Sequence, residues 1–180
     1  MICLFYQFQH FGISEYFCKE YGKNFSFPIH LHQSFEFITV TDGEMTITID
    51  TIPYHLKKGD ILLINPLELH QPRIGPDQHS YERIVLWINK NYLAHLCSNK
   101  TSLSRCFDNA NPDHTNLLSL TREQQEILSD RLNSLLREAG AENYGSDLAS
   151  KAILTSLLVE LNRICIAGQS SKKNDKDILE

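Results

Sequence analysis

Two histidines and a glutamate lie close together in the sequence and could form a binding site. They are His30, His32 and Glu36, and because side chains on an extended strand alternate between faces, all three would point the same way. Two imidazoles and a carboxylate can hold a metal ion or a polar ligand, whereas an apolar core has little reason to collect them. A second run, from Gly59 to His70, could bring a third imidazole to the same place.

Two kinds of site are compatible with these four residues. As metal ligands, they suit Zn, Ni, Mn or non-haem Fe(II) and leave an open position for substrate. As the wall of a polar pocket, they would hydrogen-bond the hydroxyl groups of a sugar and one another. Tyr54 and Trp87 could stack on the sugar ring, or they could instead fill the core of the domain.

The segment that must position these residues reads as a series of short β-strands. Asp42-Gly43 is the signal for a two-residue hairpin, which would pair the strands on either side of it. The continuous apolar run Ile61–Ile64 predicts a strand buried on both faces. Many short strands separated by turns indicate a barrel or jelly roll, to which we assign residues 1–97.

Two amphipathic helices are predicted after an irregular connection over residues 98–120. A capping box that starts at Thr121 begins the first helix, because the sequence places Gln three residues later. The second helix is expected to begin at Ser146 or Asp147 and to stop at Gly168. Together the two helices form a predicted hairpin at the carboxyl-terminal side of the barrel.

The helical region, residues 121–168, is expected to form a homodimer. Its second helix carries an apolar face that could pair with its symmetry mate in an isologous contact, or could pack only within the chain. The candidate interface residues are Leu148, Ile153, Leu157, Leu161 and Ile164. The polar and charged residues 169–180 are interpreted as a linker or tail.

Composition limits the function classes that fit the chain. It has 180 residues, enough for one domain with a small appendage, and a formal net charge of −5, which argues against direct electrostatic binding to DNA or an anionic membrane. The first residues lack a secretory signal, and no apolar run is long enough to span a membrane. Five scattered cysteines without a CxxC pair predict reduced thiols, so we expect a cytoplasmic protein.

Several of these motifs together resemble a known family. The pattern that begins at His30 and ends at Gly43 matches the first signature of the cupin superfamily, and Gly59 to His70 resembles the second, with altered spacing. One branch is more similar still: the effector-binding domain of AraC-type transcriptional regulators. The motifs that carry this resemblance are Phe27-Pro28-x-His30-x-His32, Gly59-Asp60, Asn65-Pro66-x-Glu68-x-His70 and Tyr81–Leu86.

The resemblance implies a mainly β fold, a cupin barrel (a double-stranded β-helix or jelly roll) followed by two carboxyl-terminal α-helices. It also implies a small effector, often a sugar, bound in the barrel, and a homodimer made by the helices. From the chemistry of the side chains, we expect the pocket residues to be His30, His32, Glu36, His70, Tyr54 and Trp87. Such a domain needs no cofactor and is not an enzyme.

In AraC-type regulators a DNA-binding domain with two helix-turn-helix motifs follows the helices. We therefore expect this chain to be either one part of a longer regulator or a sensor that stands alone. The main alternative is a small metal-dependent cupin enzyme, of the dioxygenase or sugar isomerase type, that uses the His/His/Glu/His cluster. A sugar-binding cupin with no DNA-binding partner is a third possibility.

Overall fold

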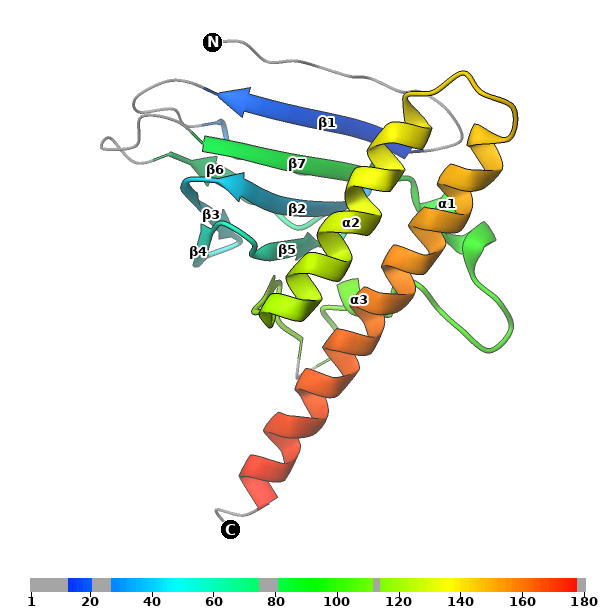
Figure 1. Cartoon of the computed structure of the whole chain (residues 1–180). Coiled ribbons are helices and arrows are strands. Elements are labelled where there is room, and N and C mark those ends of the chain that lie inside the picture. Colours follow the sequence, from blue (N-terminus) through cyan, green and yellow to red (C-terminus); the bar gives the residue numbers. More distant parts are fainter. Residues whose placement is uncertain (1–12, 21–26, 75–80, 112–113, 178–180) are drawn as a thin grey trace. The chain divides into compact units, whose positions relative to one another are not determined.

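The chain is described by a computed structural model that covers residues 13–20, 27–74, 81–111 and 114–177, with side chains from 27 to 168 within these ranges. Its strands are β1 (Ile13–Glu20), β2 (Phe35–Asp42), β3 (Glu44–Ile49), β4 (Ile52–Lys57), β5 (Ile61–Ile64), β6 (His70–Arg73), β7 (Tyr81–Ile88) and β8 (Leu117–Leu118). Its helices are α1 (Lys90–Leu96), the 3-10 turn η1 (Arg105–Phe107), α2 (Arg122–Ala139) and α3 (Ser146–Asp177). Figure 1 labels most of these elements.

The elements group into two compact units. The first contains the strands from β1 to β7 and also the later segment Asn116–Leu120, which includes β8. The second contains Leu93–Thr115 and the chain from Thr121 onwards, so it holds η1, α2 and α3. The first unit therefore carries every residue of the candidate binding site.

Two antiparallel sheets make up the first unit. One has the strand order β1-β7-β2-β5-β8 and the other the order β4-β3-β6. Buried apolar side chains from both sheets form a single cluster, so the sheets face one another across a shared core; it includes Ile38, Val85, Met45, Ile47 and Leu56. Paired sheets followed by two helices confirm the predicted fold class.

The predicted hairpin at Asp42-Gly43 is wrong. β2 pairs with β5 and β7, whereas β3 pairs with β4 and β6, so the two strands belong to different sheets. Gly43 has a φ of 73°, and at this residue the chain passes from one sheet to the other. The tight hairpin lies one turn later, where Ile49 pairs with Ile52 and Asp50 has a φ of 52°. A positive φ marks a sharp turn, but it does not determine which strands pair.

The strand Ile61–Ile64 is buried at all four positions, as the continuous apolar run predicted. It pairs with β2 through Leu63 and Phe37, both of which are buried. A turn at Lys57–Asp60 precedes it, and there the Asp60 carboxylate accepts a hydrogen bond from the Lys57 backbone N–H at 2.9 Å. The strand that leads to the His70 loop is therefore firmly held on both faces.

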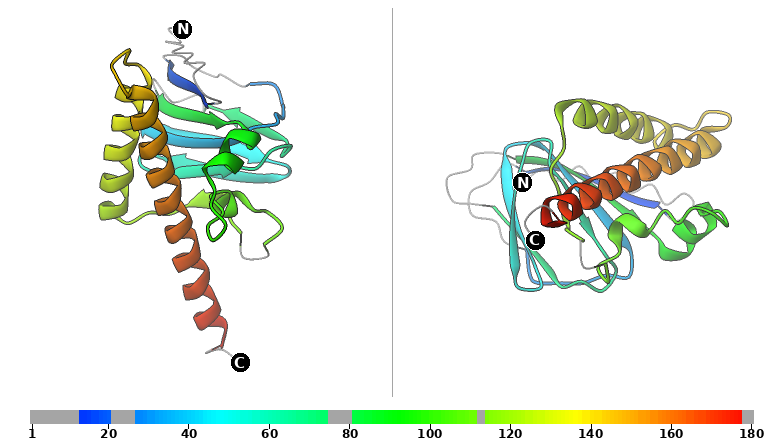
Figure 2. Two further views of the ribbon diagram at one scale, coloured as in Figure 1. Left: turned by 90° about the vertical axis from the view of Figure 1, so that its right-hand side faces the viewer. Right: turned by 90° about the horizontal axis from the view of Figure 1, so that it is seen from below.

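In the second unit, α2 and α3 form an antiparallel hairpin (Figures 1 and 2). The predicted capping box is confirmed: the Gln124 N–H donates to the Thr121 hydroxyl at 3.3 Å, and the Thr121 N–H donates to the Gln124 side chain at 2.9 Å. Each helix buries a leucine-rich face, made by Leu128, Leu132, Leu135, Leu154, Leu157, Leu158 and Leu161.

Gly168 does not end the second helix, contrary to the prediction. α3 begins at Ser146, as expected, but continues to Asp177. A glycine inside a helix costs only about 1 kcal/mol relative to alanine, which does not stop a long helix whose other residues favour the helical state. Among the described helices, none combines the length and the apolar character needed to cross a bilayer.

Candidate functional site

The site is built around the carboxylate of Glu36, which two imidazoles contact. His32 Nε2 lies 2.7 Å from Glu36 Oε2, and His70 Nε2 lies 3.1 Å from the same oxygen. Glu36 is on β2 and His70 begins β6, so the two facing sheets each supply one member. The donor atoms of the three residues lie within 4.8 Å of one another. The structure thus brings together three of the four predicted residues.

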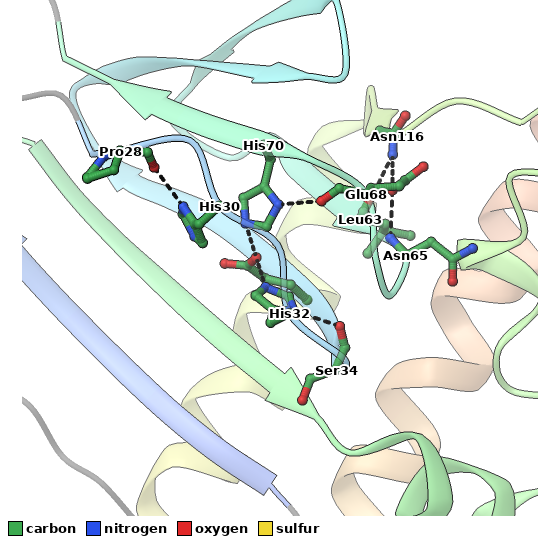
Figure 3. A network of polar contacts seen from close by, with 10 residues as sticks. Pro28, His30, His32, Ser34, Leu63, Asn65, Glu68, His70 and Asn116 are labelled. Carbon is green, nitrogen blue, oxygen red and sulfur yellow. Dashed lines mark hydrogen bonds and ion pairs between the residues drawn. The ribbon is translucent and has the colours of Figure 1, made fainter.

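All three histidines near the site are anchored through Nδ1 to a backbone carbonyl two residues away. Nδ1 lies 2.9 Å from the carbonyl oxygen of Pro28 for His30, of Ser34 for His32 and of Glu68 for His70 (Figure 3). A carbonyl oxygen only accepts, so each Nδ1 must carry the proton. In a neutral imidazole this leaves Nε2 with a free lone pair.

The charges of the cluster depend on one another. Burial alone would raise the pKa of the Glu36 carboxyl, but the close contacts and charges of His32 and His70 outweigh burial and lower this pKa to about 2. Burial acts to lower the pKa of His70, yet its contact with Glu36 raises that pKa overall. The folded protein therefore favours an ionised Glu36 beside a protonated His70.

The donor atoms of the cluster also suit a divalent cation. Its donor set of two imidazole nitrogens and one carboxylate is common at transition-metal sites. His70 is only 1% exposed, and its Nε2 has no aligned hydrogen-bond partner although it is close to Glu36. Anchoring of Nδ1 by a carbonyl is also the usual way in which a metal-binding histidine is oriented.

His30 lies beside this cluster rather than within it. Its ring centroid is 4.3 Å from that of His70 and 6.3 Å from that of His32. Its backbone pairs with His70 through reciprocal hydrogen bonds of 3.0 and 2.9 Å. Since β2 begins only at Phe35, the histidines precede the strand, and a bend, rather than strand alternation, brings His32 to Glu36.

Tyr54 and Trp87 both pack against the shared core, and they differ in how they relate to the histidines. The Trp87 ring lies 5.6 Å from that of His32, and Trp87 pairs with Glu36 across the sheet. Tyr54 instead donates a hydrogen bond from its hydroxyl to the Asn116 side chain at 3.1 Å. Trp87 is thus the aromatic residue that borders the cluster.

Sequence reasoning missed a second polar network, which holds the loop that presents His70. The buried Glu68 carboxylate accepts hydrogen bonds from the Asn65 N–H at 2.7 Å and from Asn116 Nδ2 at 3.1 Å (Figure 3). Asn116 Nδ2 also donates to the Leu63 carbonyl at 2.9 Å. Glu68 stood in a recognised motif, but Asn116 lay in the predicted irregular connection and had no local signal.

The predicted dimerisation residues differ in their accessibility. Leu157 and Leu161 are buried within the chain, whereas Leu148 is 68% exposed. Ile153 and Ile164 are half-buried. Among the described positions of α3, the exposed and half-buried ones can contact a partner without rearrangement of the hairpin.

The family model of the AraC-like ligand binding domain matches residues 13–158. The chain belongs to this family. The matched region contains the histidine cluster, the polar network behind it and most of the helical hairpin, and it confirms the resemblance drawn from the sequence motifs.

Solved structures with a similar fold include both barrel proteins and enzymes. A cupin 2 conserved barrel domain protein from Salinispora arenicola is 17% identical, over 47% of this chain and 69% of that one, with a TM-score of 0.40. A putative mannose-6-phosphate isomerase from Ralstonia eutropha is 15% identical (45% and 78%, TM-score 0.40). A DMSP lyase from Ruegeria pomeroyi is 20% identical (45% and 40%, TM-score 0.40). No curated protein matches the sequence.

Proposed function

We propose that the chain is the effector-sensing domain of an AraC-type transcriptional regulator and that its effector is a small, sugar-like molecule. Effector binding in the barrel would change the relative stability of two arrangements of the chain. A helix-turn-helix DNA-binding domain outside this chain would respond to that change, so the two sites would be coupled through free energy.

The observation that supports this proposal is the charged cluster His32–Glu36–His70 in the interior of a ligand-binding domain. Glu36 and His70 are 4% and 1% exposed, and burying such groups costs free energy that a purely structural core avoids. Trp87 lies against the same cluster and offers an aromatic surface for the apolar side of a sugar ring. Polar groups beside an aromatic face are the usual composition of a small-molecule site.

A thermal-shift screen of sugars against the wild type and two histidine variants tests the proposal. A ligand present at a hundred times its Kd should raise the midpoint by about 5–10 °C. His32→Ala should abolish this increase, while His55→Ala should keep it, because His55 lies on the exposed face of the smaller sheet and contacts Glu44. An equal increase in wild type and His32→Ala would contradict the assignment of the site.

We also propose a cytoplasmic homodimer that forms through α3. Leu148 is the member of the predicted interface that is most exposed, so Leu148→Glu should shift sedimentation from dimer to monomer. A matched charge at an exposed position of α2, Ser129→Glu, lies outside the proposed interface and reports whether any added charge has this effect. A wild-type chain that sediments only as a monomer at micromolar concentration would refute the dimer.

A metal-dependent enzyme is the second candidate, and the orientation of the histidines is the observation that favours it. His32, Glu36 and His70 would hold the ion, and the carbonyl contacts at Nδ1 would keep both imidazoles oriented toward it. A bound divalent metal supplies Lewis acidity to a substrate oxygen. The chain itself contributes the aromatic wall at Trp87 and the anchored loop around His70.

Metal content and substrate turnover separate the two candidates. Elemental analysis of untagged protein should give about one metal ion per chain if the cluster is a metal site. His70→Ala should remove the ion, and His55→Ala should not. A ligand recovered unchanged after prolonged incubation supports the sensor, whereas its conversion to a product supports the enzyme.

A further inference from the structure

Arg83 is a buried cation on the interior face of the larger sheet. It lies on β7 and is only 8% exposed. Strand register places it opposite Val40, and Trp87 on the same strand lies opposite Glu36. Since side chains on one strand alternate with a period of two, Arg83 shares a face with Val85 and Trp87, which belong to or pack against the shared core. The guanidinium therefore lies on the side of the sheet that carries the candidate site.

No anion in the described part of the chain neutralises this guanidinium. The Nε of Arg83 is buried and has no hydrogen-bond partner, and none of the ion pairs between described residues includes it. Its neighbours are instead two aromatic rings: the guanidinium carbon lies 5.1 Å from the centroid of Phe27 and 5.7 Å from that of Tyr81. Stacking of this kind orients a guanidinium but does not supply hydrogen-bond acceptors.

Among the described residues, the buried carboxylate on this face is that of Glu36, and two imidazoles already contact it. The Glu36 carboxylate interacts with His32 and His70, and four residues of strand, about 13 Å, separate Arg83 from Trp87, the cross-strand partner of Glu36. A buried and unpaired charge is strongly unfavourable, so this guanidinium calls for an anionic partner that the described residues do not supply. The guanidinium group of Arg83 indicates the chemical class of that partner.

We propose that Arg83 binds an anionic group of the effector, so that the ligand is a small acid and not a neutral sugar. This inference rests on the proposed function and narrows its ligand class. A guanidinium presents two parallel N–H donors that match the oxygens of a carboxylate or a phosphate. A two-carbon acid is too short to contact both Arg83 and the histidine cluster, so a ligand that contacts both must be at least as long as a sugar acid or a sugar phosphate.

Calorimetric titration with matched pairs of ligands tests the inference. The pairs are D-galactose with D-galacturonate and D-glucose with D-glucose 6-phosphate, which differ only in the acidic group and so distinguish a carboxylate from a phosphate. We expect the wild type to bind an acidic member of one pair, and Arg83→Gln to weaken this binding by about tenfold or more. Arg83→Lys should give an intermediate affinity, because it keeps the charge but not the two-pronged geometry.

Two controls separate binding from folding. Arg73→Gln removes an exposed arginine of β6 that contacts Gln71, and it should bind the acidic ligand as the wild type does. Without ligand, Arg83→Gln should unfold at the same temperature as the wild type or higher, since it removes an unpaired buried charge. A lower midpoint for Arg83→Gln, with unchanged affinity for the acid, would show that Arg83 only stacks on its aromatic neighbours and would overturn the inference.

The remaining outcomes distinguish this inference from the proposed function. If only the neutral sugars bind, and His32→Ala abolishes their binding, the inference fails while the proposed function stands. If an acid binds equally to wild type and Arg83→Gln, the inference fails in the same way. If none of the four ligands binds, the result contradicts both the acidic ligand and the sugar-like effector.

Discussion

Replacement of Glu36 by glutamine tests whether the cluster is held together by charge. The variant Glu36→Gln keeps the shape of the side chain but removes the negative charge that both imidazoles contact. The pKa of Glu36 falls from 4.5 to about 2 on folding, and at 1.36 kcal/mol per unit this corresponds to about 3 kcal/mol of stability. Because Glu36 is buried, solvent screening does not reduce this value as it would at the surface.

The sign of the pH dependence follows from the two shifts. A lowered pKa means that the folded state binds the Glu36 proton less tightly, so the stabilisation is complete above pH 4.5 and is lost as the pH falls toward 2. The His70 pKa is raised, so its contribution is complete below 6.5 and is lost as the pH rises through the folded pKa. The cluster should be most stabilising between about pH 5 and 6.5.

Urea denaturation from pH 3 to 8, followed by the fluorescence of Trp87, the only tryptophan, measures this dependence. The unfolding free energy lost in Glu36→Gln should decrease from about 3 kcal/mol at pH 5 to about 1.5 kcal/mol at pH 3. The matched control is Glu44→Gln, which breaks an exposed histidine contact of 3.2 Å and should change stability by about 0.5 kcal/mol or less. A loss in Glu36→Gln that does not vary with pH would refute the charge argument.

Three further predictions concern the polar network, α3 and the turn before α3, and urea denaturation measures all of them. Asn116→Ala should lower the free energy of unfolding by about 2–3 kcal/mol, because it removes a hydrogen-bond donor from the buried Glu68 carboxylate. The control is Asn133→Ala, at an exposed position. An equal loss of stability in both variants would contradict the role of the network. Gly168→Ala should stabilise α3 by about 0.5–1 kcal/mol, since an added Cβ meets nothing within 4 Å. Gly145→Ala should instead destabilise the protein by about 1 kcal/mol, because Gly145 has a φ of +81°. Stabilisation by both glycine replacements would show that the backbone angle is not the cause.

Local patterns were sufficient to identify most of the secondary structure. The capping box at Thr121 and the buried strand Ile61–Ile64 were predicted correctly, because the signal for each lies within a few residues of itself. The turn at Asp42-Gly43 was also predicted correctly, but the strand pairing that we inferred from it was wrong. Whether a turn joins two strands of one sheet or carries the chain to a second sheet depends on which partners the strands find elsewhere.

The candidate site residues show the same division between what the sequence predicted and what the fold decided. The sequence by itself identified His32, Glu36 and His70 as candidate site residues from their types and motif spacing, and the structure places the three in one cluster. Only the tertiary structure decided that His30 lies beside the cluster, because its distance to the others depends on the bend before β2 and on its pairing with His70. A local motif specifies the residue types of a site. The contacts between those residues form only where the two sheets pack face to face.

Arg83 and Asn116 depended on the tertiary structure entirely. An arginine on a strand is normally a solvent-exposed residue, and nothing near Arg83 in the sequence indicates that it is buried with no anion beside it among the described residues. Asn116 reaches Glu68 only because β8 returns to pair with β5. The sequence determined the local elements and the chemistry of the motif, since both depend on neighbouring residues. Burial and long-range partners were decided by the fold, since they depend on residues far apart in the chain.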